Sequence, residues 1–302
     1  MESKCIGENS EFASYHPLVN LLYFVFVIGI TMFSLSPYFL AVTLLFSWLY
    51  SILLKGKKGI KMNLAMGISI LVIMTVVNLF FNNNGETVLL YINTNRITAE
   101  SIGYGIAGGI MLLSVVVWFS CFNVIMSSDK LIYLFGKAAP VLGLTLSMIF
   151  RFIPLLQSRF AEISIGQKCM GRGHDQGSLI KRARQFTKEI SILIAWSLEA
   201  SIESADSMEA RGYGLRGRTS FHLFKFTRRD GVLAVLFAAT GMIVAAAVAS
   251  GATNMYFYPK IVIPPMNVQT AGALICYCIL SAAPIIIDIT GELRWKRSDL
   301  IM

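Results

Sequence analysis

The chain has 302 residues, of which 55% are hydrophobic and only 14% charged, and its mean hydropathy is +0.65. A soluble globular domain carries about 25% charged residues, so the composition excludes a protein that is water-soluble along its whole length. The charges are also unevenly spread, because residues 151–230 hold 14 Lys/Arg and 8 Asp/Glu within a chain of net charge +9. This asymmetry predicts an apolar membrane part and one basic insert.

Six charge-poor stretches are long enough to cross a bilayer, which takes about 20 apolar residues. Pro37 separates the first two and predicts a tight hairpin between them. The sequence therefore predicts an all-α polytopic membrane protein with about six transmembrane helices plus long cytoplasmic helices. The predicted spans are residues 18–35, 38–54, 62–81, 101–122, 231–251 and 269–288.

A further apolar stretch, residues 139–156, contains Arg151 and Pro154. An arginine at the centre of a bilayer costs about 2.5–3.5 kcal/mol on insertion scales. We therefore expect an interfacial or protein-covered helix here rather than a seventh span.

The basic residues predict the orientation of the chain, because cytoplasmic loops carry an excess of Lys and Arg. The 55–61 loop (KGKKGIK) holds lysines and no acid, and the insert and the tail Arg294-Trp295-Lys296-Arg297 are basic. Placing these three inside puts both termini in the cytoplasm. The expected organisation is four spans in residues 1–122, a cytoplasmic or interfacial insert in 123–230, and two spans with a basic tail in 231–302.

Two long helices are predicted within the insert, from about Pro140 to Gly171 and from about Phe186 to Ala210. The first carries an apolar stripe at three- and four-residue steps, and the second carries small residues every four positions, which lets two helix backbones approach closely. Helix-to-helix packing accounts for both patterns whatever the function. The stripe residues are Met148, Phe152, Leu155, Leu156, Phe160 and Ile163, and the small residues are Ser197, Ser201 and Ala205.

Each of these helices ends in an arginine between two small residues. A glycine after the last helical residue closes a helix, and a cation in the last turn complements its dipole, so ordinary capping explains either end alone. As a pair they are harder to explain by capping, because each planar guanidinium group is suited to bind a carboxylate. Two such groups could enter two binding sites on partner proteins, as a chain driven by a pair of ATPases would need. The two ends read Gly171-Arg172-Gly173 and Ala210-Arg211-Gly212.

These ends resemble the two Ala-Arg-Gly-type motifs of the transmembrane T component of energy-coupling factor (ECF) transporters. The matching segments read QKCMGRG at residues 167–173 and MEARGYG at residues 208–214, and Gly171 departs from the pattern because the family more often has alanine there. The resemblance covers most of the chain and is most specific over residues 128–220. Further similarity lies in His16-Pro17, in Ser128-Asp129-Lys130-Leu131 and in Arg151-Phe152-Ile153-Pro154.

The resemblance implies a subunit that is not itself an enzyme, in an ATP-driven importer of vitamins or transition-metal ions in a bacterial or archaeal cell membrane. It implies that Arg172 and Arg211 contact two cytoplasmic ABC-type ATPases, which bind the ATP, while this chain binds no cofactor or metal directly. Gly171, Gly173, Ala210 and Gly212 would be the small flanks that let the arginines insert. A substrate-binding membrane S component would face the two coupling helices at Met148, Phe152, Leu155, Leu156, Phe160, Ser197, Ser201 and Ala205.

Two other classes of function stay open at this point. A membrane-embedded enzyme is disfavoured because His16, His174 and His222 lie far apart and form no His-Glu-x-x-His motif. A self-sufficient permease is disfavoured by the near absence of charge within the predicted spans, and it leaves the paired arginines unexplained. Gly105 and Gly109 are better explained as a GxxxG helix-packing face than as part of a dinucleotide fingerprint.

The basic stretch at residues 213–229 (YGLRGRTSFHLFKFTRR) mixes arginines with aromatic residues, a pattern also found in nucleic-acid-binding proteins. It directly precedes a predicted span on the cytoplasmic side. We therefore expect it to rest on the anionic lipid headgroups of the bilayer, with Phe221, Phe224 and Phe226 dipping in, and we expect no nucleic acid as a partner.

Overall fold

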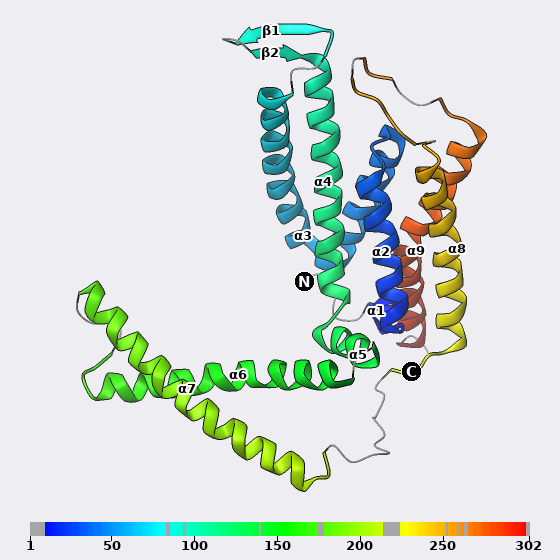
Figure 1. The fold of residues 1–302 in the computed structure, drawn as a ribbon. Coiled ribbons are helices and arrows are strands. Elements are labelled where there is room, and N and C mark those ends of the chain that lie inside the picture. Colours follow the sequence, from blue (N-terminus) through cyan, green and yellow to red (C-terminus); the bar gives the residue numbers. More distant parts are fainter. Residues whose placement is uncertain are drawn as a thin grey trace. The chain divides into compact units, whose positions relative to one another are not determined.

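The computed structural model describes residues 10–82, 85–92, 95–138, 140–173, 178–213, 224–251, 253–258, 260–262 and 265–299. The chain divides into two compact units, a bundle unit of residues 1–131 and 224–302 and an insert unit of residues 132–223. Figure 1 labels the elements in chain order. They are α1 (Glu11–Ser14), α2 (Pro17–Phe33), α3 (Pro37–Phe81), β1 (Val88–Ile92), β2 (Asn95–Thr98), α4 (Ala99–Ile125), α5 (Ser128–Ala138), α6 (Pro140–Cys169), α7 (Leu179–Ala210), α8 (Arg228–Ala249) and α9 (Val268–Asp299).

Within the described residues, six helical segments are long and apolar enough to cross a membrane, which confirms a helical, multi-pass fold. Two differences from the predicted spans concern length. The predicted span 18–35 is α2, an apolar helix of 17 residues, and the segment Val141–Cys169, which we expected at the interface because of Arg151, meets the length and hydropathy of a span. The six segments are Pro37–Lys57, Gly59–Phe81, Ala99–Ile125, Val141–Cys169, Arg228–Ala249 and Val268–Trp295.

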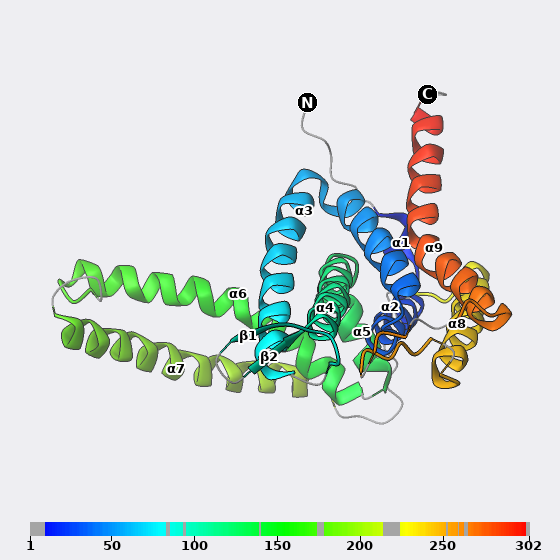
Figure 2. The same ribbon diagram turned by 90° about the horizontal axis from the view of Figure 1, so that it is seen from above.

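The predicted spans 38–54 and 62–81 are the two arms of α3, which bends at Gly56 (Figure 2). Gly56 has φ 59° and ψ −142°, a backbone conformation that side chains with a Cβ rarely adopt. Beyond the bend, a Cβ on Gly59 would lie 2.9 Å from the carbonyl oxygen of Ser51, and the Ser51 hydroxyl donates to the side-chain oxygen of Asn63 at 3.4 Å. The sharp reversal therefore needs no long loop, and helix continues on both sides of the bend where we expected a loop at 55–61.

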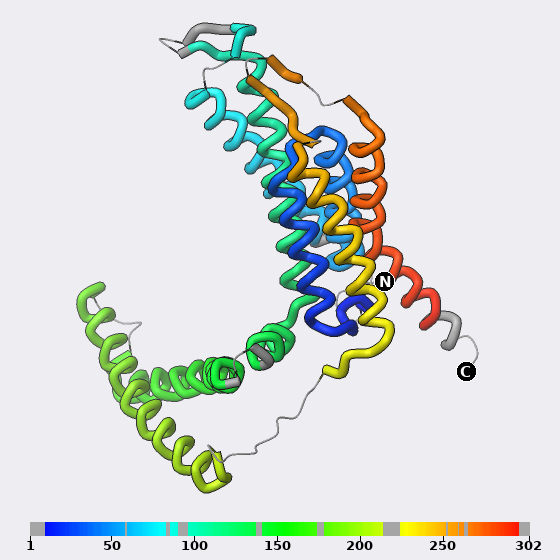
Figure 3. Tube along the Cα trace, turned by 45° about the vertical axis from the view of Figure 1, so that its right-hand side comes forward, coloured from blue at the N-terminus to red at the C-terminus, as the bar shows by residue number. Residues whose placement is uncertain are grey.

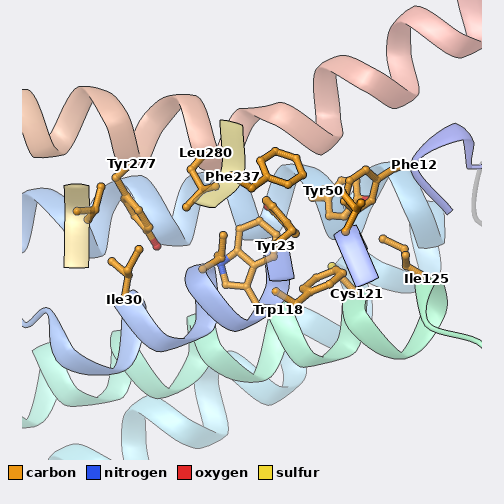
Figure 4. Packing of buried hydrophobic residues seen from close by; sticks show 14 of the residues in the cluster. Phe12, Tyr23, Ile30, Tyr50, Trp118, Cys121, Ile125, Phe237, Tyr277 and Leu280 are labelled. Atoms are coloured by element: carbon orange, nitrogen blue, oxygen red, sulfur yellow. The ribbon is translucent and has the colours of Figure 1, made fainter. Parts of the chain in front are cut away.

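Aromatic side chains form the core of the bundle unit (Figure 4). Tyr23 lies between Phe12, at a ring-centroid distance of 5.4 Å, and Trp118, at 6.0 Å, and both pairs have edge-to-face geometry. Such pairs contribute about 0.5–1.5 kcal/mol beyond their buried area. The Trp118 indole donates to the Thr43 hydroxyl at 3.0 Å. In the same unit α2 packs beside α8, and α8 beside α9 (Figure 3).

Glycines let α4 approach the second arm of α3 closely. A Cβ on Gly105 would lie 2.9 Å from the Cα of Thr75, and a Cβ on Gly109 would lie 2.9 Å from a methyl carbon of Leu71. These contacts confirm the GxxxG face predicted for this helix, because close approach of two backbones is what the motif supplies.

Residues 82–100, which we expected to be an outer loop, contain an antiparallel β-hairpin. Strand β1 pairs with β2, with a bulge between Val88 and Leu90. The Lys260 ammonium lies 3.1 Å from a carboxylate oxygen of Glu86, and Tyr104 packs edge-on against Phe257 at 5.3 Å. The segments that follow α3 and α8 are therefore joined at this end of the bundle unit.

One acidic residue departs from the near absence of charge that we expected within the spans. Asp288 ends the predicted span 269–288, yet α9 continues past it and its side chain is buried. It accepts hydrogen bonds from the Ser10 hydroxyl, the Phe12 amide and the Tyr50 hydroxyl, at 2.8–3.3 Å. Because several donors bond this carboxylate, its burial is explained by its structural role and does not indicate a transport path.

Candidate functional site

The first arginine-tipped end closes α6 with a Schellman motif. Gly171 has φ +72°, and its amide donates to the Lys168 carbonyl oxygen at 3.0 Å. The Arg172 amide donates to the Gln167 carbonyl oxygen at 2.9 Å. These two bonds, six-to-one and five-to-two, define the motif and satisfy carbonyls that the end of the helix leaves without donors.

The second end closes α7 with the same motif. Gly212 has φ +77°, and its amide donates to the Glu209 carbonyl oxygen at 2.9 Å. The Tyr213 amide donates to the Met208 carbonyl oxygen at 3.0 Å. Arg211 is the C-cap residue, with φ −84° and ψ 6°. Both predicted helix ends are therefore closed by a left-handed glycine, as the sequence indicated.

The two arginines differ in their register relative to these caps. Gly171 and Gly212 occupy the same left-handed position, so Arg211 precedes its glycine whereas Arg172 follows its own. Gly173, the flank that matches Gly212 by sequence, lies two residues beyond the left-handed position and is buried. Gly171, which matches Ala210 by sequence, therefore ends a helix that Ala210 continues.

Both guanidinium groups are exposed. Within the residues that the structure describes, neither Arg172 nor Arg211 has an ion pair or a side-chain hydrogen bond. Their donors are therefore free to bind a carboxylate outside the chain, which is the chemistry that a charge-assisted contact needs.

Helices α6 and α7 pack against each other (Figure 2), and the length of α7 separates the two arginines. The Phe160 ring lies edge-on to Phe186 at 5.8 Å, and the Arg159 guanidinium stacks over the Trp196 ring at 5.1 Å. Arg172 comes shortly before α7 begins and Arg211 caps its end. A helix of this length spans about 48 Å at 1.5 Å per residue, so the two tips lie near opposite ends of α7.

The residues that we expected to face a membrane partner fall into two groups. Leu155, Ser201 and Ala205 are exposed, whereas the others are half-buried, and of these Phe160 packs on α7. The half-buried residues are Met148, Phe152, Leu156, Phe160 and Ser197.

The sequence analysis missed a set of exposed apolar side chains on the same two helices. Their spacing in α7, one isoleucine or leucine every four residues, was a signal that could have identified them. Bare apolar side chains on a helix pair mark a surface suited to a protein or lipid partner. They are Ile149 and Ile153 on α6 and Ile194, Leu198 and Ile202 on α7.

Charge also distinguishes the two ends. The last turns of α7 carry Glu199, Glu203, Asp206 and Glu209, all exposed, before Arg211. The last turns of α6, by contrast, carry one basic residue, Lys168, and no acid after Glu162. Within the described residues no group of three or more His, Cys, Asp or Glu side chains could hold a metal ion.

Most of the basic stretch at residues 213–229 lies outside the described residues, including Phe221. Of its other two phenylalanines, Phe224 lies at the start of the described segment and Phe226 is exposed by 57%. The Phe226 ring also contacts the His16 ring edge-on at 5.2 Å, so this residue packs within the bundle unit.

Comparison with known proteins places the chain in a family. Residues 12–223 match the family described as CbiQ, Cobalt transport protein. The chain is 28% identical over 239 residues to the energy-coupling factor transporter transmembrane protein EcfT of Streptococcus thermophilus, covering 75% of this chain and 90% of that protein. It is 33% identical over 180 residues to EcfT of Brevibacillus brevis, covering 55% and 67%, and 24% identical over 240 residues to EcfT of Acidaminococcus fermentans, covering 76% and 89%.

Proposed function

Because this chain belongs to the CbiQ/EcfT family of energy-coupling factor transporter transmembrane components, we propose that it transmits ATP-driven motion from two cytoplasmic ATPases to a substrate-binding S component. The chain is a multi-pass membrane protein and a non-catalytic transporter subunit. The cargo would be a micronutrient, a vitamin or a metal ion, and the S component would select it.

The observation that carries the proposal is the pair of exposed arginines, each held at a helix end by a left-handed glycine cap. A capped helix end holds its arginine more rigidly than a loop would, so less side-chain and backbone freedom is lost when a partner binds. Arg172 and Arg211 would each contact one ABC-type ATPase, with Gly171, Gly173, Ala210 and Gly212 leaving room for the partner surface. ATP would be bound by those ATPases and not by this chain.

The exposed apolar face of α6 and α7 supports contact with an S component. Ile149, Ile153, Leu198 and Ile202 are at least 44% exposed, whereas most of the predicted packing stripe of α6 is half-buried. Ser201 and Ala205 lie on the exposed side of α7 and would let a partner helix approach closely. We propose that these residues, together with Leu155, form the S-component surface.

The distribution of basic residues supports an orientation with both termini in the cytoplasm of a bacterial or archaeal cell. Lys55, Lys57 and Lys61 flank the bend of α3, and a cluster of this kind is retained on the cytoplasmic side. The insert and the basic tail would lie on that side as well, next to anionic headgroups.

Co-purification tests the proposal directly. The affinity-tagged chain, extracted from its native membrane in mild detergent, should bring down two ATPase subunits and one small membrane protein. In the matched control, the double variant Arg172→Glu/Arg211→Glu should lose the ATPases and keep the small membrane protein. Recovery of the wild-type chain alone, or of the same partners with the double variant, would contradict the proposal.

A further inference from the structure

A short segment at the start of the described chain binds charged side chains from three different helices. This segment, residues Ser10–His16, contains the single turn of α1, and we call it the N-terminal strap. Its Phe12 amide donates to Asp288 of α9 at 2.8 Å, and its His16 amide donates to Asp230 of α8 at 3.1 Å. Its Ala13 carbonyl oxygen accepts from the Lys130 ammonium of α5.

Lys130 is the unusual member of this set, because it is a buried cation held by main-chain carbonyls. Its ammonium also donates to the carbonyl oxygen of Ile125, the last residue of α4, at 2.8 Å. That carbonyl is one of the four that a helix end leaves without a donor. Burial lowers the pKa of Lys130 from the usual lysine value of 10.5. The side chain therefore ties together the strap, the end of α4 and the start of α5.

Lys130 lies at the boundary between the two units of the chain. The bundle unit ends at Leu131 and the insert unit begins at Ile132, so the chain leaves the bundle directly after Lys130. Because α5 runs from Ser128 to Ala138, the crossing occurs inside a helix. A helix transmits the orientation of its first turn to the residues that follow.

The return crossing is held by the same strap. The chain re-enters the bundle unit at Phe224, and the Phe226 ring packs edge-on against His16. Asp230 then caps α8 by accepting from the Thr227 amide at 2.8 Å while it binds the His16 amide. Both chain crossings between the units are thus attached to the strap within seven residues of the boundary.

We propose that the N-terminal strap is the fixed pivot of energy coupling, and that Lys130 is the positioning residue that holds the start of α5 to it. Motion imposed at Arg172 and Arg211 then reaches the bundle unit at Lys130 and at residues 224–230, which the strap holds. This inference rests on the proposed function. It adds residues of the bundle unit, whereas both arginine tips belong to the insert unit.

The test compares Lys130→Met with Lys61→Met, which removes an exposed lysine from α3 in the same unit. In proteoliposomes holding the complete transporter, uptake and ATP hydrolysis are measured on one preparation. We expect Lys130→Met to keep ATP hydrolysis and to lower uptake per ATP about fivefold or more, the lower end of common coupling factors. Lys130→Arg and Lys61→Met should keep the wild-type ratio, whereas a merely structural role would lower the melting temperature and both activities together.

A second measurement keeps the proposal testable if Lys130→Met does not assemble. Nitroxide labels at Leu236 of α8 and Ser158 of α6, in a cysteine-free background, report the distance distribution between the two units in the purified chain alone. We expect the milder variant Ser10→Ala, which removes a donor to Asp288, to broaden this distribution, and Lys61→Met to leave it unchanged. An unchanged distribution in Ser10→Ala, or a wild-type uptake ratio in Lys130→Met, would overturn the pivot. A wild-type complex that does not couple hydrolysis to uptake would contradict the proposed function instead, while the distance measurement still decides the pivot.

Discussion

The two arginine-tipped ends of the insert unit share one cap and differ in almost everything else. Gly171 and Gly212 close their helices with the same pair of hydrogen bonds, yet Arg172 lies beyond its glycine and Arg211 lies before its own. The end of α7 is acidic, whereas the end of α6 is basic. Two motifs that look alike in sequence therefore present their guanidinium groups in different settings, and we expect their partners to hold them with different strength.

The largest effect is expected from Arg211→Glu. Arg211 is part of the capped helix, because its amide is bonded to the Ser207 carbonyl oxygen at 3.2 Å, so its guanidinium is pre-organised for binding. Reversing the charge leaves a partner carboxylate unpaired, which costs about 2–5 kcal/mol. ATP-driven uptake should fall at least about thirtyfold, since about 1.4 kcal/mol is tenfold. Arg184→Glu, an exposed arginine of the same helix, is the control and should keep uptake.

A smaller loss is expected from Arg172→Glu. Arg172 follows the left-handed glycine and leaves the helix, so it has more freedom to lose on binding. We expect a reduction in uptake that is measurable against Arg184→Glu but weaker than the loss in Arg211→Glu. Equal losses in the two variants would show that the difference in cap register has no consequence for coupling.

A third variant, Gly212→Ala, tests the contribution of the glycine cap of α7 apart from the charge of Arg211. At φ +77°, Gly212→Ala introduces left-handed strain of about 1–2 kcal/mol, which shifts the position of Arg211 without removing its charge. The affinity of the chain for the purified ATPase pair should fall by up to about tenfold. A loss as large as that of Arg211→Glu would mean that the glycine contacts the partner itself.

The smallest effect is expected from Gly171→Ala, which restores the residue more usual in the family. A Cβ at this position meets no atom within 4 Å, and α6 can escape the strain by extending toward Gly173. Arg172 would then adopt the helical register that Arg211 already has. ATPase affinity should change by less than in Gly212→Ala, and a greater loss would show that the early stop of α6 is required.

Much of the membrane part could be predicted from the sequence, because charge-free length is a direct requirement of the bilayer. Gly105 and Gly109 predicted a helix-packing face, because glycine permits a close approach, and the structure identifies α3 as its partner. The bend at Gly56 could not be predicted, because a basic segment between two apolar stretches is typical of a loop. In the structure α3 is helical on both sides of Gly56, and Ser51 and Asn63 join its two arms.

At the candidate site the two glycine-capped helix ends were predicted from sequence, but the register of their arginines was not. The segment Gly171-Arg172-Gly173 offers two glycines to end one helix, and local sequence does not choose between them. The start of α7 at Leu179, ahead of the predicted Phe186, was missed for a similar reason, because its first turns are mostly polar and exposed. The role of Lys130 depends on contacts far apart in the chain, which no local pattern reports.

The most direct test of the account is substrate uptake by the double variant Arg172→Glu/Arg211→Glu, inserted and folded, in proteoliposomes that contain both ATPases and the S component. The charge-conserving Arg172→Lys/Arg211→Lys variant provides the control for insertion and folding. The account predicts no ATP-driven uptake in the charge-reversed protein and at least partial uptake in the control. Normal uptake in the charge-reversed protein would contradict it.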